Sequence, residues 1–98
     1  MAFQHSFVYI LRCSDNSYYT GVTANIELRV QQHNDGKFKG YTFKRRPLEL
    51  VFYTEFTDIN LAILTEKQIK KWSRAKKEAL INNNLEDLPN LAKKRFKT

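Results

Sequence analysis

Residues 7–21 read FVYILRCSDNSYYTG, and this stretch decides how the rest of the chain is arranged. Its two halves are rich in aromatic and β-branched residues, which favour strands, and they flank the turn signal Ser14-Asp15-Asn16. The sequence therefore predicts a β-hairpin with Tyr9 on the first strand and Tyr19 and Gly21 on the second.

The length of the turn determines whether the two tyrosines lie together. Side chains alternate between the faces of a sheet, so a two-residue loop at Asp15-Asn16 would pair Tyr9 with Val22 and separate Tyr9 from Tyr19. An odd-numbered loop or a bulge would put both phenols on one face. If the tyrosines act together, for example to orient water or phosphate, the loop must be odd or bulged.

Downstream of the hairpin, the sequence predicts one more strand and three helices. Asn25 suits a helix N-cap, Gly36 suits a left-handed C-terminal cap, and Thr57 or Asp58 begins the next helix. The expected strands are 7–13, 18–22 and 48–54, and the expected helices are 25–34, 58–72 and 74–82. The expected buried stripe of the second helix is Leu61, Leu64, Thr65, Gln68, Ile69 and Trp72.

The length and charge of the chain limit the functions that it can have. The 98 residues fit one domain, residues 1–98, with a basic tail at 85–98. Lys and Arg total 17 against 10 acidic residues, and the net charge of +7 favours a polyanionic partner such as nucleic acid. The single cysteine, Cys13, excludes an internal disulfide and suits a cytoplasmic protein. We expect no signal peptide and no membrane-spanning segment.

A basic loop follows the first helix. Residues 37–47 read KFKGYTFKRRP and place Phe38, Tyr41 and Phe43 among lysines and arginines. This composition suits phosphate contacts with some base stacking. A solvated loop whose aromatic side chains hold it on the core has the same composition, so the sequence leaves both interpretations open.

Known short motifs of other chemistries are missing from the sequence. There is no glycine-rich phosphate loop, paired-cysteine zinc pattern, nucleophile elbow or acidic calcium loop. Each polar candidate also has a structural alternative: Tyr9 could be a core tyrosine, and Glu66 could pair with Lys70 one helical turn away. The candidates are Tyr9, Tyr19, Gly21, Arg29, His33 and Glu66.

Taken in order, these residues resemble the GIY-YIG nuclease domain. The two tripeptides of that family correspond to Phe7-Val8-Tyr9 and Tyr19-Thr20-Gly21, separated by nine residues. Arg29 within ELRVQQHN and Glu66 within LTEKQIKKWSRAKKEALI follow at the family's positions. The resemblance covers about residues 6–82 and implies an α+β fold, a three-stranded antiparallel sheet flanked by helices.

The chain is most similar to the small stand-alone bacterial branch of this family. It shares Arg45-Arg46-Pro47 before the third strand and the helical segment KKWSR at 70–74. Phe7 and Val8 replace the family's first glycine and isoleucine, and Thr20 replaces the second isoleucine. The family's late asparagine could be any residue of Asn82-Asn83-Asn84.

The resemblance implies metal-dependent endonuclease activity on DNA. Glu66 would be the protein ligand of one divalent metal, Mg²⁺ or alternatively Mn²⁺. Arg29 would hold the scissile phosphate, and Tyr9 would accept a proton from the attacking water if nearby positive charge favours its ionised form. Tyr19 would orient the water or phosphate, and His33 would assist proton transfer or bind phosphate.

The expected partner is DNA, with branched or damaged DNA as the working substrate, and the protein is expected to act as a monomer. A protein partner could supply specificity. The alternative function is a nucleic-acid-binding module with weak or no catalysis. The predicted nucleic-acid contacts are Gly21, Lys44, Arg45, Arg46, Lys70, Lys71 and Arg74.

Overall fold

The computed structural model of the chain describes residues 5–82. Every boundary lies within two residues of its predicted position, and a 3-10 turn at Phe43–Arg45 is added. Asn83, Asn84 and the basic tail lie outside the described residues. The elements are β1 (Ser6–Arg12), β2 (Tyr18–Thr23), α1 (Ile26–Asn34), β3 (Glu49–Phe56), α2 (Ile59–Lys70) and α3 (Arg74–Ile81).

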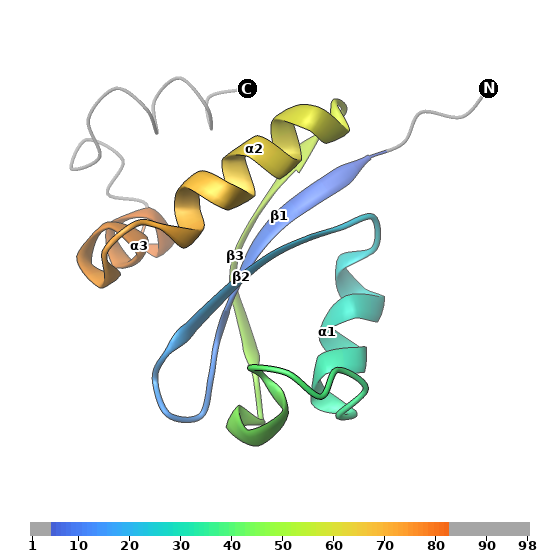
Figure 1. Ribbon diagram of the computed structural model, residues 1–98, viewed down its shortest axis with the longest axis vertical. Coiled ribbons are helices and arrows are strands. Elements are labelled where there is room, and N and C mark those ends of the chain that lie inside the picture. Colours follow the sequence, from blue (N-terminus) through green and yellow to red (C-terminus); the bar gives the residue numbers. More distant parts are fainter. Residues whose placement is uncertain (1–4, 83–98) are drawn as a thin grey trace.

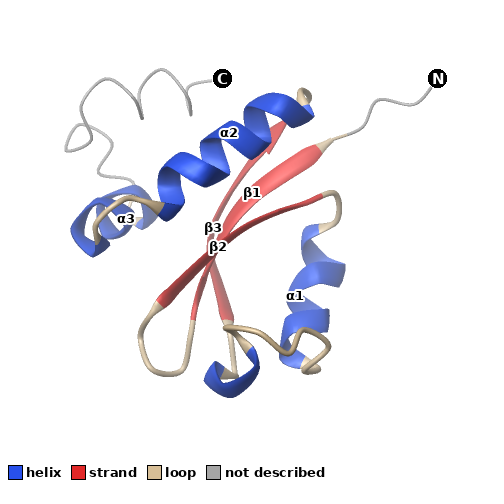
Figure 2. Cartoon of the chain, in the orientation of Figure 1, coloured by secondary structure: helices blue, strands red, loops and turns tan. Residues whose placement is uncertain are grey.

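The three strands form one antiparallel sheet, as predicted, and their order in it is β2-β1-β3. Helix α1 covers one face, and α2 and α3 lie on the other (Figures 1 and 2). Because β1 is central and covered on both faces, consecutive side chains from Val8 to Leu11 are fully buried. This position explains why the first strand is apolar on both faces.

Each face of the sheet has its own hydrophobic core. On the side of α2 and α3, Val8 and Ile10 pack with residues of both helices. On the side of α1, Tyr9 and Leu11 pack with Cys13 and with residues of α1 and β3. Tyr9 therefore belongs to a core and also carries a polar hydroxyl, which needs a hydrogen-bond partner there.

The turn between β1 and β2 is a three-residue loop at 14–16. The Cys13 N–H donates to the Ser17 carbonyl at 2.8 Å, and the Asn16 N–H donates to the Cys13 carbonyl at 2.9 Å. Asn16 adopts a left-handed conformation with φ 67°, which suits the last position of such a loop. The Asp15 carboxylate accepts from the Ser17 hydroxyl and N–H at 2.6 and 3.1 Å.

This odd loop sets the register on which the site depends. Tyr9 pairs with Gly21, and Leu11 pairs with Tyr19, so the two tyrosines and the glycine share one face of the sheet. The prediction of an odd loop is confirmed. A Cβ atom on Gly21 would lie 2.5 Å from the Tyr9 hydroxyl oxygen, so the Tyr9 ring occupies the space that a side chain would fill.

The predicted buried stripe of α2 is wrong at two positions. Leu61 and Leu64 are 45% and 46% exposed, whereas Ala62 and Glu66 are buried. Ala62 is small enough to let the helix lie close to β1, where it packs with Val8. The helix is therefore rotated about its axis relative to the expectation, and the rotation turns Glu66 inward.

Side-chain caps bound the helices where the sequence indicated. The Asn25 Oδ1 atom accepts from the Leu28 N–H at 3.0 Å, and Asp58 caps α2. The Ser73 hydroxyl accepts from the Lys76 N–H at 3.2 Å, and Ser73 is the N-cap of α3.

We predict that Gly21→Ala destabilises the fold by about 1–3 kcal/mol, because the added methyl group must displace a buried ring from a packed core. Gly40→Ala is the matched control, since a Cβ there meets no atom within 4 Å. Urea unfolding monitored by circular dichroism measures both. Equal midpoints for the two variants would contradict the close contact between Tyr9 and Gly21.

Candidate active site

A buried hydrogen-bonded chain links β1, α1 and the loop that follows α1. The Tyr9 hydroxyl lies 3.2 Å from His33 Nε2, and His33 Nδ1 lies 2.8 Å from Thr42 Oγ1. The three side chains are at most 3% exposed. A neutral imidazole has one donor and one acceptor nitrogen, so the chain can run from Tyr9 to Thr42 or in reverse. Thr42 was not among the sequence candidates.

Burial is the main influence on the pKa values of Tyr9 and His33. Desolvation, and then the neighbouring Tyr19, raise the pKa of Tyr9 to about 12, although a hydrogen bond and positive charge from Arg29 act in the opposite direction. Burial, followed by the positive charge of Arg29, lowers the pKa of His33. At neutral pH the phenol therefore keeps its proton, and the imidazole is neutral. Arg29 alone does not bring about the ionisation of Tyr9 that the sequence-based mechanism requires.

Aromatic side chains hold the polar groups in place. The Tyr19 ring lies 5.2 Å from the His33 ring and stacks on Tyr41 at 6.1 Å. Phe38, from the loop after α1, lies 4.7 Å from His33 and beneath the guanidinium of Arg29 at 5.2 Å. The loop therefore supplies part of the wall of the site, and Tyr41 remains partly exposed beside it.

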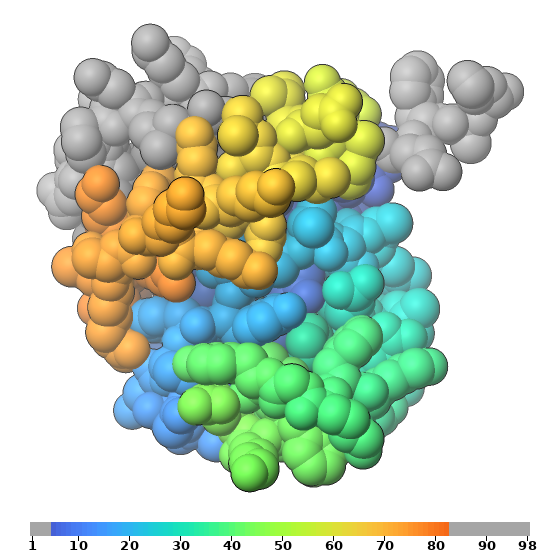
Figure 3. Space-filling model, in the orientation of Figure 1, coloured from blue at the N-terminus to red at the C-terminus, as the bar shows by residue number. Residues whose placement is uncertain are grey.

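Glu66 approaches this cluster from the opposite layer. It is 8% exposed, and its Oε2 atom lies 2.7 Å from Lys70 Nζ. Its negative charge contributes to the raised pKa of Tyr9, so the carboxylate is close enough to act on the phenol. Helix α2 packs against β2, which is an edge strand. Figure 3 shows the blue hairpin exposed between α2 and the green loop.

The pair of Glu66 and Lys70 is the structural alternative considered from the sequence, and it is present. The hydrogen bond that Lys70 donates to the Glu66 carboxylate is the main cause of the raised pKa of Lys70. The Lys70 side chain is 52% exposed, whereas the Glu66 side chain is 10% exposed. The ammonium group can therefore move into solvent while the carboxylate stays in place.

The loop arginines are engaged within the protein. Arg45 Nε lies 3.0 Å from the Asp15 carboxylate, and its guanidinium lies 3.9 Å from the centre of the Tyr41 ring. Arg46 donates to the Phe43 carbonyl at 2.9 Å and covers the Phe43 ring. Both interpretations of the loop remain open, because these contacts hold it in place while Lys44 and part of each arginine face solvent.

The ends of the loop are joined by one side chain. The Asn34 amide donates to the Leu48 carbonyl at 3.1 Å and accepts from the Leu48 N–H at 2.7 Å. This pair of hydrogen bonds resembles a rung of a β-ladder and brings the end of α1 beside the start of β3. The position of Thr42 within the loop depends on this closure.

Of the remaining predicted nucleic-acid contacts, Arg74 is also bound internally. It donates to the Asn16 carbonyl at 2.5 Å and pairs with Glu78 at 3.1 Å, which ties α3 to the hairpin. Lys71 is exposed. Asn82 ends α3 through its backbone N–H, which donates to the Glu78 carbonyl at 2.9 Å.

The donor set around Glu66 suits a hard cation. Within residues 5–82 there is no group of three or more His, Cys, Asp or Glu side chains that could hold a metal ion. Zinc prefers three or four such ligands, whereas Mg²⁺ is commonly held by one or two carboxylates, water and substrate phosphate. A single buried carboxylate whose charge acts on the Tyr9 phenol therefore fits Mg²⁺ or Mn²⁺ bound together with a phosphodiester. No helix in the described part is long and apolar enough to cross a bilayer.

The fold and the cluster define a small α+β domain that brings Tyr, His and Arg together on one face of a sheet and a carboxylate from the opposite layer. The sequence profile of the GIY-YIG catalytic domain matches residues 5–79. The chain therefore belongs to the GIY-YIG family of nucleases.

Its relatives are small proteins of the UPF0213 group. The chain is 49% identical over 82 residues to a UPF0213 protein of Syntrophus aciditrophicus, covering 83% of this chain and 94% of that protein. It is 43% identical over 81 residues to the UPF0213 protein YazA of Bacillus subtilis, covering 83% and 82% of the two chains. Because the alignments cover most of both chains in each pair, they confirm the prediction that this chain belongs to the small stand-alone branch.

A solved structure has the same fold. The solution NMR structure of the UPF0213 protein BH0048 from Bacillus halodurans aligns with a TM-score of 0.54 at 36% identity. The alignment covers 96% of this chain and 98% of that one.

We predict that the stability of the protein falls as the pH is lowered through the ordinary pKa of histidine, about 6.5. The folded state holds the pKa of His33 below that value, so the unfolded chain takes up a proton first. His33→Gln removes this dependence, while His5 remains in both proteins. Urea midpoints at pH 7.5 and 5.5 should fall more for the wild type than for the variant. Parallel changes in the two proteins would contradict a buried neutral His33.

Proposed function

We propose that the protein is a metal-dependent endonuclease that hydrolyses phosphodiester bonds in DNA. The observation that carries the proposal is the joining of Tyr9, His33 and Arg29 in one cluster on which the Glu66 carboxylate also acts. Membership of a nuclease family supports the same reaction class.

Arg29 is assigned to the scissile phosphate. Its guanidinium lies over Phe38 at the edge of the hydrogen-bonded chain, and it is only partly buried. A planar guanidinium can donate two parallel hydrogen bonds to phosphate oxygens and offset charge that develops in the transition state. Tyr19, which meets the His33 ring edge to face and stacks on Tyr41, orients the attacking water or the phosphate.

The geometry favours Tyr9 as a proton relay. With a pKa of about 12, the phenol is protonated at neutral pH and cannot by itself be a standing base. As water attacks phosphorus, its proton passes to the Tyr9 oxygen, while the phenol proton passes to His33 Nε2. His33 then carries the additional proton, and its Nδ1–H is held by Thr42. The lowered pKa of His33 keeps the imidazole available as the acceptor.

Glu66 is assigned as the protein ligand of Mg²⁺, with Mn²⁺ as a substitute. When bound, the metal stabilises charge on the scissile phosphate and the leaving oxygen. Lys70 occupies Oε2 in this structure and has to leave it, which its exposed side chain permits. The released ammonium is then available to DNA phosphates.

The proposed contacts to DNA extend from the hairpin to the last two helices. The substrate class proposed is branched or damaged DNA, cut by a cytoplasmic monomer. The contacts assigned to DNA are Gly21, Lys44, Arg45, Arg46, Lys70, Lys71 and Arg74.

A binding module without catalysis is the second candidate. It is favoured by the pairing of the Glu66 carboxylate with Lys70. It is also favoured by the sequence, because Phe7, Val8 and Thr20 replace the usual residues of the family tripeptides. The two candidates differ in whether phosphodiester bonds are broken.

We predict that wild-type protein nicks supercoiled or branched DNA in the presence of Mg²⁺ or Mn²⁺, and that Glu66→Gln lowers the rate by roughly two orders of magnitude or more. The loss is expected because the amide cannot replace the charge of the metal ligand. Gel assays of nicking measure the rates. Glu49→Gln is the matched control, since it makes the same change at an exposed carboxylate on β3. Unchanged cleavage by Glu66→Gln would refute the assignment of the metal ligand.

The logarithm of DNA affinity falls linearly with the logarithm of salt concentration, and the steepness of this fall reflects the number of phosphate contacts. We predict that Lys71→Ala makes the slope less steep by about one, because one phosphate contact is lost. Fluorescence anisotropy without added metal measures the slope for both proteins. An unchanged slope would remove Lys71 from the DNA interface. Steep salt dependence of the wild type with no cleavage of any tested DNA would establish the binding module instead.

A further inference from the structure

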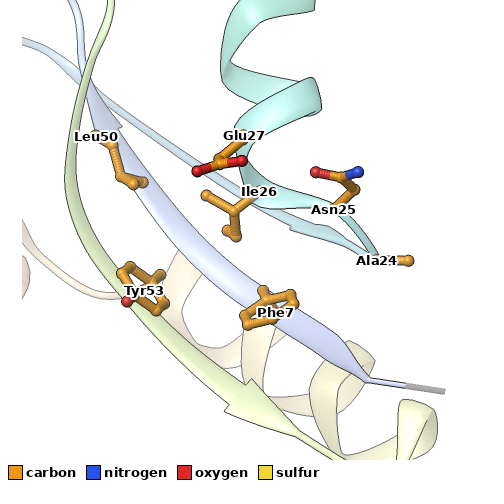
Figure 4. Close-up of a pocket in the computed structure, with 7 residues that line it drawn as sticks. All are labelled: Phe7, Ala24, Asn25, Ile26, Glu27, Leu50 and Tyr53. Carbon is orange, nitrogen blue, oxygen red and sulfur yellow. The ribbon is translucent and has the colours of Figure 1, made fainter. Parts of the chain in front are cut away.

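A second concave site lies beside the N-terminal end of α1, away from the proposed catalytic cluster. It has a volume of about 410 Å³, within the range of small ligand pockets. Phe7 from β1 and Leu50 and Tyr53 from β3 line it, together with Ile26 and Glu27 from α1 (Figure 4). The function proposed above does not use this pocket.

The register shows that the pocket and the proposed site lie on the same face of the sheet. They occupy different parts of that face. Tyr9 pairs with Gly21 on β2 and with Tyr53 on β3. The proposed site faces β2, and the pocket faces β3, with α1 covering the same face. Glu27 and Arg29 lie two residues apart on this helix, so the pocket and the site are attached to one short rigid element.

The lining combines two aromatic rings with negative charge. The Phe7 and Tyr53 rings meet edge to face at 6.1 Å, and Tyr53 is 56% exposed. The Glu27 carboxylate lies over the pocket near Ile26 (Figure 4). Glu55 is paired with Phe7 across the sheet and so lies on the same face. Among the described residues, no lysine or arginine lines the pocket.

This lining differs from five of the other aromatic side chains within residues 5–82. Several rings already carry a cation from the same protein, as expected for a chain with a net charge of +7. Within residues 5–82, no such contact involves Phe7 or Tyr53. The rings already covered are Tyr18, Phe38, Tyr41, Phe43 and Trp72.

We propose that this pocket binds an arginine side chain presented by a protein partner. A guanidinium can stack on the exposed Tyr53 ring and donate to the Glu27 carboxylate, and its planar form suits both contacts better than an ammonium. The charge of the lining disfavours a phosphate-bearing ligand, because the Glu27 carboxylate would repel it. The inference concerns binding alone and does not depend on nuclease activity.

The test uses the full-length protein labelled with ¹⁵N and two short peptides, acetyl-Gly-Gly-Arg-Gly-Gly-amide and its citrulline counterpart. Citrulline keeps the shape of arginine and removes its charge. The arginine peptide should shift the amide resonances of Phe7, Glu27 and Tyr53 and bind at least about fivefold more tightly than the citrulline peptide. Equal binding of both peptides would leave only an apolar groove and overturn the proposal.

Variants separate the pocket from general attraction to a charged surface. Glu27→Gln should weaken binding of the arginine peptide about fivefold, whereas Glu49→Gln, with the same change in net charge, should leave it within about twofold. Tyr53→Thr, which retains strand propensity, should also weaken binding. Equal effects of the two glutamate variants would overturn the assignment of Glu27.

Two further measurements can overturn the choice of occupant. The first is a titration with adenosine monophosphate. If this nucleotide shifts the same resonances more strongly than the arginine peptide does, the pocket is a nucleotide site. Sedimentation velocity that shows a dimer dissociated by Glu27→Gln would assign it to a second copy of this chain. A monomeric wild type that binds the arginine peptide and not the nucleotide supports the proposal, whether or not the protein cuts DNA.

Discussion

The close passage of the Tyr9 ring over Gly21 is the contact on which the rest of the structure depends. It requires the odd loop between β1 and β2, because any even loop would turn one of the partners to the other face. It also lets the phenol remain buried in the core and still meet His33. The core and the proposed site are therefore the same packing arrangement, so a change that loosens one also displaces the other.

Burial is the largest influence on both titratable groups of the hydrogen-bonded chain: Arg29 opposes it at Tyr9 and adds to it at His33. The phenol stays neutral although Arg29 favours its ionised form, and the imidazole stays neutral because burial and the positive charge of Arg29 both favour that form. A neutral hydrogen-bonded chain can pass a proton along without creating a buried ion at rest, which would be costly in this environment. Glu66, as a nearly buried carboxylate, requires a counter-charge, and Lys70 supplies it in this structure.

The order of elements and the face shared by Tyr9 and Tyr19 could be predicted from the sequence, because turn residues and the period of a strand carry that information. The rotation of α2 could not. Leucine at 61 and 64 indicates a buried stripe, but the close approach of the helix to β1 depends on the small side chain of Ala62. Thr42 was missed for a related reason, since a single threonine in a loop gives no signal until the fold brings it to His33. Likewise, Arg45 and Arg46 read as phosphate ligands, and only the structure shows their internal partners.

The paired hydrogen bonds between Asn34 and Leu48 give the segment 35–47 the character of an Ω-loop, a compact excursion whose two ends are held together. In such a loop, insertions and substitutions between the fixed ends disturb the supporting scaffold little. Exposed positions such as Lys44 can therefore diversify while the strand and helix that carry Tyr9 and His33 keep their positions. The closing amide of Asn34 thus lets the exposed positions of the loop evolve new preferences while Phe38 and Thr42 keep their contacts with His33.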